Sequence, residues 1–144
     1  MMPKITPYIN GEATLTNFIN YMNYCMTGFM RASISAQKIS SVYYLTVKAG
    51  SVIETVGELY YFSENTVGTN DSASFTKIYF YVEYQSGLIK SITSVPHWSN
   101  TAQGYYGTSI YYPHRHFAVI TLDGAGGNII KTELMDDQRY ESYI

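Results

Sequence analysis

Two hydrophobic periodicities divide the chain, one typical of a helix near the N-terminus and one typical of β-strands in the rest. From Ala13 to Met30 the apolar residues recur at intervals of three and four, as on one face of an α-helix; they are Leu15, Phe18, Ile19, Met22, Cys25, Met26 and Phe29. Gly28 is a stop signal for this helix. Two prolines and a glycine in residues 1–12 indicate an extended arm before it.

The opposite face of the predicted helix carries only uncharged polar residues, which are Thr14, Asn17, Asn20, Asn23 and Thr27. A helix that faces solvent usually carries Lys and Glu there, so this face either meets another subunit or is a merely polar surface. Asn is a weak helix former, which leaves an extended segment as an alternative. If the helix packs against its copies, the expected oligomer interface consists of Leu15, Phe18, Ile19, Met22 and Met26.

After Ser33 the pattern becomes typical of β-strands. Short runs rich in Val, Ile, Tyr and Phe predict strands at residues 42–48, 51–55, 59–62, 78–84, 88–92, 105–112, 117–122 and 129–132. Glycine-containing turns separate them, and the loop 123–128 joins the last two into a hairpin. The series predicts a mainly β fold, an antiparallel β-sandwich or a small barrel, preceded by the N-terminal arm and one helix.

Length and composition fit one compact unit with a mostly uncharged polar surface. A chain of 144 residues is enough for one domain with a core. Charged residues make up 14% of the chain, and 16 residues are Tyr, which combines contact area with a polar tip. We therefore divide the chain into residues 1–35, an arm and helix for attachment and oligomerisation, and residues 36–144, a β-domain with an acidic C-terminal tail.

Several classes of function conflict with the sequence. A net charge of −2 without a Lys and Arg cluster argues against nucleic-acid binding. The sequence has neither a run of 18 apolar residues nor the features of a signal peptide, so we expect a soluble protein without membrane insertion. Cys25, the only cysteine, allows no internal disulfide and is expected to be a small buried hydrophobe rather than a nucleophile.

Familiar catalytic motifs are absent from the sequence, which has no G-x-S-x-G, H-E-x-x-H, C-x-x-C or phosphate-binding loop. We expect no enzymatic activity and no cofactor. The sharpest local feature is Tyr111-Tyr112-Pro113-His114-Arg115-His116. On an extended strand the two histidines face the same side, and in a three-fold assembly they would supply six nitrogens to a metal ion. Arg115 between them favours a charged surface instead, so we expect no metal site.

Aromatic residues form the other candidate site. Trp98, the only tryptophan, and the nearby tyrosines are candidates for surface or ligand contact, since exposed Trp and Tyr stack on sugars or anchor protein partners; these residues are Trp98, Tyr105, Tyr106, Tyr111 and Tyr112. The alternative is that Trp98 fills the core or pins a loop to the sheet. If these rings are exposed, the chain could be a carbohydrate-binding module or an adhesin tip.

Three segments resemble β-modules of fibre and other virion structural proteins of tailed bacteriophages. The first is the predicted hairpin Ala49–Phe62, with a Gly-Ser start, a Gly turn and a Leu-Tyr strand. The second runs from Val95-Pro96-His97-Trp98 to Gly104-Tyr105-Tyr106, and the third is His116–Gly124, a closing strand with an Asp-Gly turn. The resemblance covers about residues 42 to 132.

The resemblance implies a short head-fibre, tail-fibre, spike or head-decoration protein, because the chain lacks the shaft repeats of a long fibre. Such proteins are commonly homotrimers with an attaching N-terminal part and an outward β-domain. The implied partners are copies of the chain, other virion proteins and a host cell-surface glycan as receptor. The implied location is the virion, after synthesis in the host cytoplasm.

Overall fold

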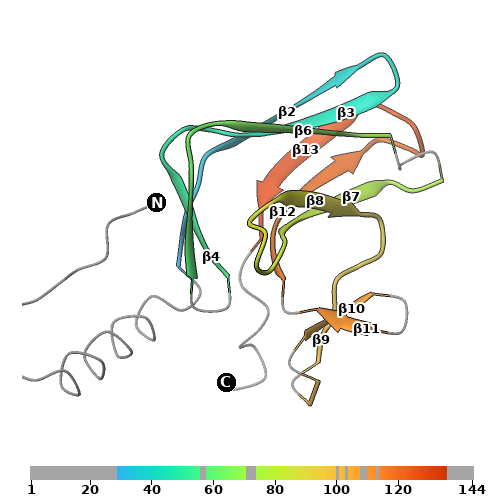
Figure 1. Ribbon diagram of the computed structural model, residues 1–144. Helices are drawn as coiled ribbons and strands as arrows, with labels where there is room; N and C mark the ends of the chain where they lie inside the picture. The colour runs from blue at the N-terminus through green and yellow to red at the C-terminus, as the bar shows by residue number, and fades with distance from the viewer. Residues whose placement is uncertain are drawn as a thin grey trace, which may run out of the picture.

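The described residues of the computed structural model are built almost entirely from antiparallel β-strands (Figure 1). The structure describes residues 29–55, 58–70, 74–99, 101–102, 104–107, 110–112 and 114–135. The strands within these residues are β1 (Met30–Arg31), β2 (Ile34–Ile39), β3 (Val42–Val47), β4 (Ser51–Thr55), β5 (Glu58–Phe62), β6 (Asn65–Thr69), β7 (Lys77–Val82), β8 (Ile89–Ile92), β9 (Trp98–Ser99), β10 (Gly104–Gly107), β11 (Ile110–Tyr112), β12 (Arg115–Leu122) and β13 (Ile129–Leu134).

Two three-stranded sheets, β2-β3-β6 and β1-β4-β5, are formed by the same three stretches of chain, which bend together (Figure 1). Three residue steps separate Arg31 on β1 from Ile34 on β2, whereas five steps separate the residues with which they pair on the middle strand. The strand register therefore shifts by two residues at the bend. Gly50 lies in this insertion with a φ of +89°, a conformation that favours glycine. Its N–H donates to the Phe62 carbonyl at 2.9 Å, which fixes the bend.

A four-stranded sheet, β13-β12-β7-β8, lies below β2-β3-β6 in Figure 1. β13 runs beside β2, and β8 is close to β6, so the two sheets face one another. The main core fills the space between them and extends to the bent half of the first sheet; it consists of Tyr43, Leu45, Val47, Ile53, Phe62, Ile78, Phe80, Val82, Ile89, Phe117, Ala118, Ile120 and Leu122. Burial of these side chains is the main stabilising term of the fold.

A small sheet of β9, β10 and β11 projects from the end of the four-stranded sheet (Figure 1). Its central strand pairs Tyr105 with Trp98 on one side and with Tyr112 on the other. The strand predicted over residues 105–112 is therefore wrong in one respect, because the chain turns back between β10 and β11. The sequence pattern did not resolve this hairpin, since both arms are equally rich in Tyr.

The mainly β, antiparallel fold is confirmed, and none of the four sheets of the described residues closes into a barrel. The sequence prediction missed β1, β2, β6 and β9. The predicted helix is not supported: residues 13–28 lie outside the described residues, and its last residue, Met30, belongs to β1. The N-terminal arm, the expected oligomer interface and most of the acidic tail also lie outside the described residues; that interface is Leu15, Phe18, Ile19, Met22 and Met26.

Candidate functional site: a row of aromatic rings

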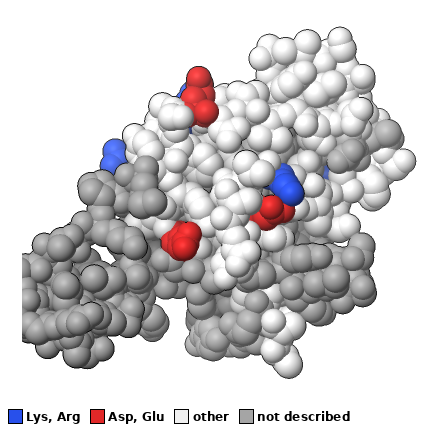
Figure 2. All heavy atoms as spheres, in the orientation of Figure 1, with Lys and Arg blue, Asp and Glu red and all other residues white. Residues whose placement is uncertain are grey.

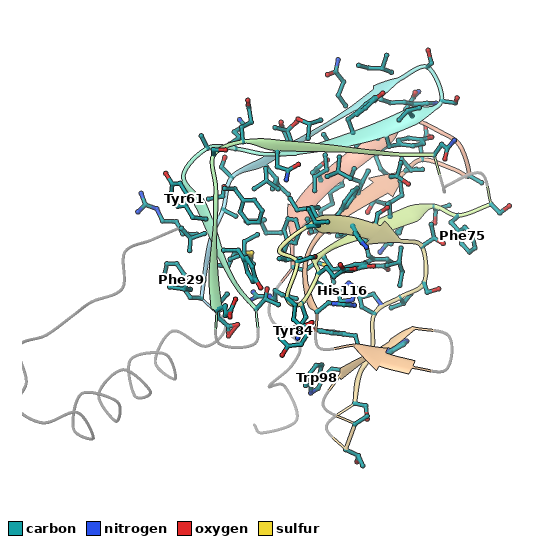
Figure 3. All side chains as sticks on the ribbon, in the orientation of Figure 1. Phe29, Tyr61, Phe75, Tyr84, Trp98 and His116 are labelled. Carbon is teal, nitrogen blue, oxygen red and sulfur yellow. The ribbon has the colours of Figure 1, made fainter. Side chains whose placement is uncertain are left out.

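Five aromatic rings form a continuous row where the small sheet meets the four-stranded sheet. In order they are Trp98, Tyr105, His116, Tyr81 and His114. Successive ring centroids are 5.1, 4.4, 5.1 and 4.7 Å apart. The first two contacts are edge-to-face, and the last is stacked, which are the preferred geometries of aromatic pairs. Figure 3 shows His116 between the four-stranded sheet and the strands that carry Trp98.

A β-bulge in β12 sets the direction of the histidines. His116 pairs with Tyr81, and Ala118 pairs with Phe80, so Phe117 is an extra residue in β12. The bulge reverses the alternation of side chains before it. His116 therefore shares a face with Tyr81, away from the core strands, whereas Arg115 falls on the core side with its partner Val82.

His116 is a buried, neutral ring of this row. Its residue is 3% exposed, and Nδ1 has no hydrogen-bond partner within the described part of the chain. Burial lowers the pKa of His116 to about 3, and the neighbouring His114 adds to the decrease. Near neutral pH this imidazole therefore packs as an uncharged aromatic ring, and its low basicity makes it a poor general base.

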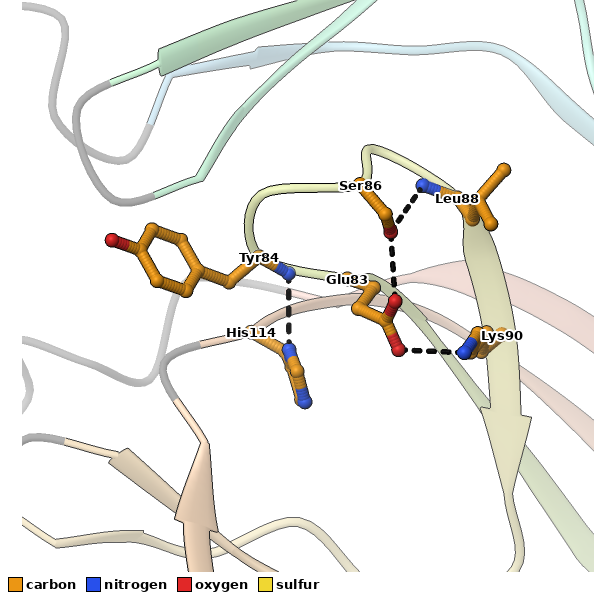
Figure 4. A network of polar contacts seen from close by, with 6 residues as sticks. All are labelled: Glu83, Tyr84, Ser86, Leu88, Lys90 and His114. Atoms are coloured by element: carbon orange, nitrogen blue, oxygen red, sulfur yellow. Dashed lines mark hydrogen bonds and ion pairs between the residues drawn. The ribbon is translucent and has the colours of Figure 1, made fainter.

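His114 is held by a hydrogen bond as well as by stacking. The Tyr84 backbone N–H donates to His114 Nδ1 at 3.1 Å, so the proton of the neutral ring resides on Nε2 (Figure 4). Burial lowers the pKa of His114, against the opposing effect of Glu83. In the same turn, Glu83 accepts a 2.8 Å hydrogen bond from Ser86 and forms a 2.7 Å ion pair with Lys90, which together lower the pKa of Glu83 (Figure 4).

Arg115 corrects the expectation of a charged surface at this motif. Its residue is 1% exposed, and its Nη1 donates to the Glu54 carbonyl oxygen at 3.5 Å. The Glu54 side chain is buried as well. The motif thus connects β12 to β4 through a buried guanidinium, and its two histidines connect β12 to the small sheet.

The candidate contact residues occupy different environments. Tyr105 is 2% exposed between Trp98 and His116, so its ring is not available for stacking on a ligand. Trp98 is half-buried in β9, where its ring packs against Tyr105. Three further candidates lie in β10 and β11, and their side chains are outside the described residues; they are Tyr106, Tyr111 and Tyr112.

Sequence reasoning missed Tyr81 and Glu54 as members of this region. Tyr81 alternates with the core residue Phe80, so its placement on the opposite face was available from strand periodicity. Its contact with both histidines depends on the pairing of β7 with β12 and on the bulge. Glu54 carried no signal, because a short strand with one acid normally exposes it.

The described residues do not bring together the side chains that commonly bind a metal ion. Within them, no group of three or more His, Cys, Asp or Glu side chains is placed to share an ion. They also contain no helix long and apolar enough to cross a membrane.

Comparisons with protein-family models, with curated proteins and with solved structures found no match to this chain. The geometry of the described residues and the sequence resemblance therefore carry the functional proposals below.

The low pKa of His116 predicts a loss of stability in mild acid. In the unfolded chain the His116 imidazole binds a proton near pH 6.5, whereas in the folded chain it does so only near pH 3. The free energy of unfolding therefore decreases as the pH is lowered from 6.5 toward 3. From pH 7 to pH 5 we expect His116 to contribute a loss of about 2 kcal/mol in the free energy of unfolding. Urea unfolding at both pH values measures it.

His116→Phe should remove this contribution, because it keeps an aromatic ring but cannot titrate. His97→Gln, which removes an exposed imidazole on the segment before β9, serves as the matched control and should retain the wild-type loss. An equal loss in wild type and His116→Phe would contradict the prediction.

Proposed function

We propose that this protein is a non-enzymatic structural protein that acts by assembly and surface contact, specifically a short head-fibre, tail-fibre or decoration protein of a tailed bacteriophage virion. The observation that carries the assembly function is the exposed apolar surface at both edges of the four-stranded sheet. The bacteriophage assignment rests on the sequence resemblance over residues 42 to 132. On this proposal the part of residues 1–35 that precedes β1 attaches the protein, and the β-domain, which includes β1 and β2, faces outward.

Large apolar side chains are exposed at each of these edges. On β13, Ile130 is 64% exposed, and Leu134 is exposed on the same strand. At the other edge, Leu88 and Val95 flank β8, and each is 55% exposed. Val95 lies at the same end of the β7-β8 pair as exposed Phe75. The same edges also carry the ion pairs Lys131–Glu133 and Lys90–Glu83, and the large apolar side chains exposed beside them favour burial against another subunit or partner.

The low surface charge supports the same proposal. The view in Figure 2 shows few Lys, Arg, Asp and Glu side chains among the described residues of that face. Cores of protein–protein interfaces are depleted in charge, and burying an unpaired charge is costly. A surface of this composition can therefore pack closely against copies of itself.

A direct prediction is that the full chain is a homotrimer in solution, with three times the 16.3 kDa mass of one chain. Ile130→Glu should shift the mass toward the monomer, because it places a charge in the proposed contact. Multi-angle light scattering at micromolar concentration measures it. Thr66→Glu, an exposed substitution in the other sheet, is the matched control and should leave the mass unchanged.

A second variant tests the interface expected near the N-terminus. If Phe18→Glu dissociates the oligomer and Ile130→Glu does not, residues 1–35 hold the subunits together, and the β13 edge meets a different virion protein. A wild-type monomer over the whole concentration range would overturn the proposed assembly. The virion assignment itself requires the chain in gradient-purified phage particles by mass spectrometry, and its presence only in the soluble fraction would refute it.

A further inference from the structure

The outer face of the sheet β2-β3-β6 is polar and open, and its three strands carry no charged residue on this side; exposed Lys48 and Glu64 follow at one end, directly after β3 and directly before β6. The strand registers and the alternation of burial place eight residues on this face, which are Ser35, Gln37, Ile39, Val42, Tyr44, Thr46, Thr66 and Gly68. None is ionisable. Lys38, the cation within β2, is directed elsewhere: its Nζ donates to the Gly126 carbonyl at 3.0 Å and lies 5.5 Å from the Tyr43 ring.

Tyr44 occupies the middle strand of this face, with one edge of its ring close to Gly68. A Cβ atom at Gly68 would be 2.7 Å from Tyr44 Cε1, so only glycine allows the ring to lie this close to the neighbouring strand. The Cε1–Cδ1 edge of the ring thus packs against β6, and the residue as a whole is half-buried. An aromatic ring that is held in place at the surface of a sheet and is partly open to solvent offers a stacking surface.

Hydrogen-bonding groups surround this ring. Gln37 and Gly68 pair with Tyr44 on the two neighbouring strands, about 5 Å away, and Thr46 lies about 7 Å along the same strand. Thr46 Oγ1 and Thr66 Oγ1 share a 2.9 Å hydrogen bond, which leaves further lone pairs for a ligand. At one end, the paired residues Ile39 and Val42 add apolar area.

The chemistry of this face selects an uncharged, hydroxyl-rich partner. A neutral sugar ring carries no charge, presents C–H groups to an aromatic ring and presents hydroxyls to Ser, Thr and Gln side chains. The open face, which extends over three strands, suits an extended chain of such rings.

We propose that the outer face of β2-β3-β6 binds a neutral polysaccharide, with one sugar ring stacked on Tyr44 and with Gln37 and Thr66 among its hydrogen-bonding residues. This site differs from the aromatic row, whose rings pack against one another. It goes beyond the proposed assembly function, which depends on the edges of the other sheet.

Affinity electrophoresis of the full chain tests the proposal. Native gels would contain dextran, mannan or barley β-glucan as neutral probes, and polysialic acid or alginate as anionic probes. At least one neutral probe should retard the protein, and the anionic probes should not. Tyr44→Ala should weaken the apparent affinity at least tenfold, while Tyr44→Phe should stay within about twofold, because stacking of the ring supplies most of the interaction.

Two further variants keep the result interpretable. Gln37→Glu is nearly isosteric, lies on an exposed position and should weaken binding at least fivefold by placing a charge next to Tyr44. Tyr61→Ala removes an exposed tyrosine of β5, outside this face, and should bind as wild type. Circular dichroism confirms that each variant is folded.

Three outcomes would overturn the inference. They are no retardation by any neutral probe, stronger retardation by anionic probes, and unchanged binding in both Tyr44→Ala and Gln37→Glu. A change in solution mass caused by Tyr44→Ala, without polysaccharide binding, would instead identify the face as a subunit interface. The mass test with Ile130→Glu is independent of all these outcomes, so failure of one proposal is distinguishable from failure of the other.

Discussion

Replacement of Arg115 by alanine is expected to lower the free energy of unfolding by about 3–5 kcal/mol. The guanidinium is almost fully buried and donates to the Glu54 carbonyl oxygen, and the acidic side chain of Glu54 is buried as well. The substitution removes a large packed side chain and also removes a cation from a region that buries an acid. Urea unfolding at neutral pH, followed by circular dichroism, measures the change.

Arg115→Met separates the two contributions, because it keeps most of the side-chain volume but not the charge. We expect it to remain destabilised, by less than Arg115→Ala. Arg31→Ala, at an exposed position of β1, is the matched control and should change stability by no more than about 0.5 kcal/mol. A loss below about 1 kcal/mol in Arg115→Ala would show that this residue does not link β12 to β4 energetically.

Tyr105→Ala is expected to detach the small sheet from the end of the four-stranded sheet and to cost about 3–5 kcal/mol. Tyr105 contacts both Trp98 and His116, so the substitution breaks the aromatic row in its middle and removes two ring pairs, each worth about 0.5–1.5 kcal/mol beyond the buried area. Since Trp98 is the only tryptophan, its fluorescence reports the local change directly. We expect a red shift of its emission under conditions where circular dichroism still shows folded β-structure.

The controls distinguish ring packing from a general effect of losing a tyrosine. Tyr105→Phe keeps the ring and should retain the wild-type emission maximum of Trp98, whereas Tyr61→Ala removes an exposed ring elsewhere and should leave both signals unchanged. Should Tyr105→Ala retain the wild-type fluorescence and stability, the row would have no role in positioning the small sheet.

Strand periodicity predicted the central elements of the fold well. The alternation of residues 78–82 and the apolar runs in residues 42–48 and 117–122 correspond to β7, β3 and β12, and these strands supply most of the core. The strand β2 was missed, because its sequence Ile-Ser-Ala-Gln-Lys-Ile buries only small or partly exposed residues at a sheet edge. The weaker alternation of such edge strands is a consequence of their partial burial.

The sequence predicted several residues of the candidate site but not how they are arranged. Both candidate motifs, the segment around Trp98 and the segment Tyr111–His116, contribute to one aromatic row, although they were considered as separate surface features. The interpretation of His114-Arg115-His116 as a charged surface was wrong, since burial depends on β4, β7 and the small sheet packing around β12. The motif itself contains no information about those neighbours.

By itself the sequence determined the β-class of the fold, its sparsely charged surface and the placement of His114 and His116 on one common side, because these follow from composition and from the two-residue period of a strand. The tertiary structure decided which side that is. The extra residue Phe117 reverses the alternation in β12, sends Arg115 toward the buried Glu54 and places both histidines against Tyr81. A bulge depends on the partner strand as much as on its own residues, so only the paired sheet fixes its position.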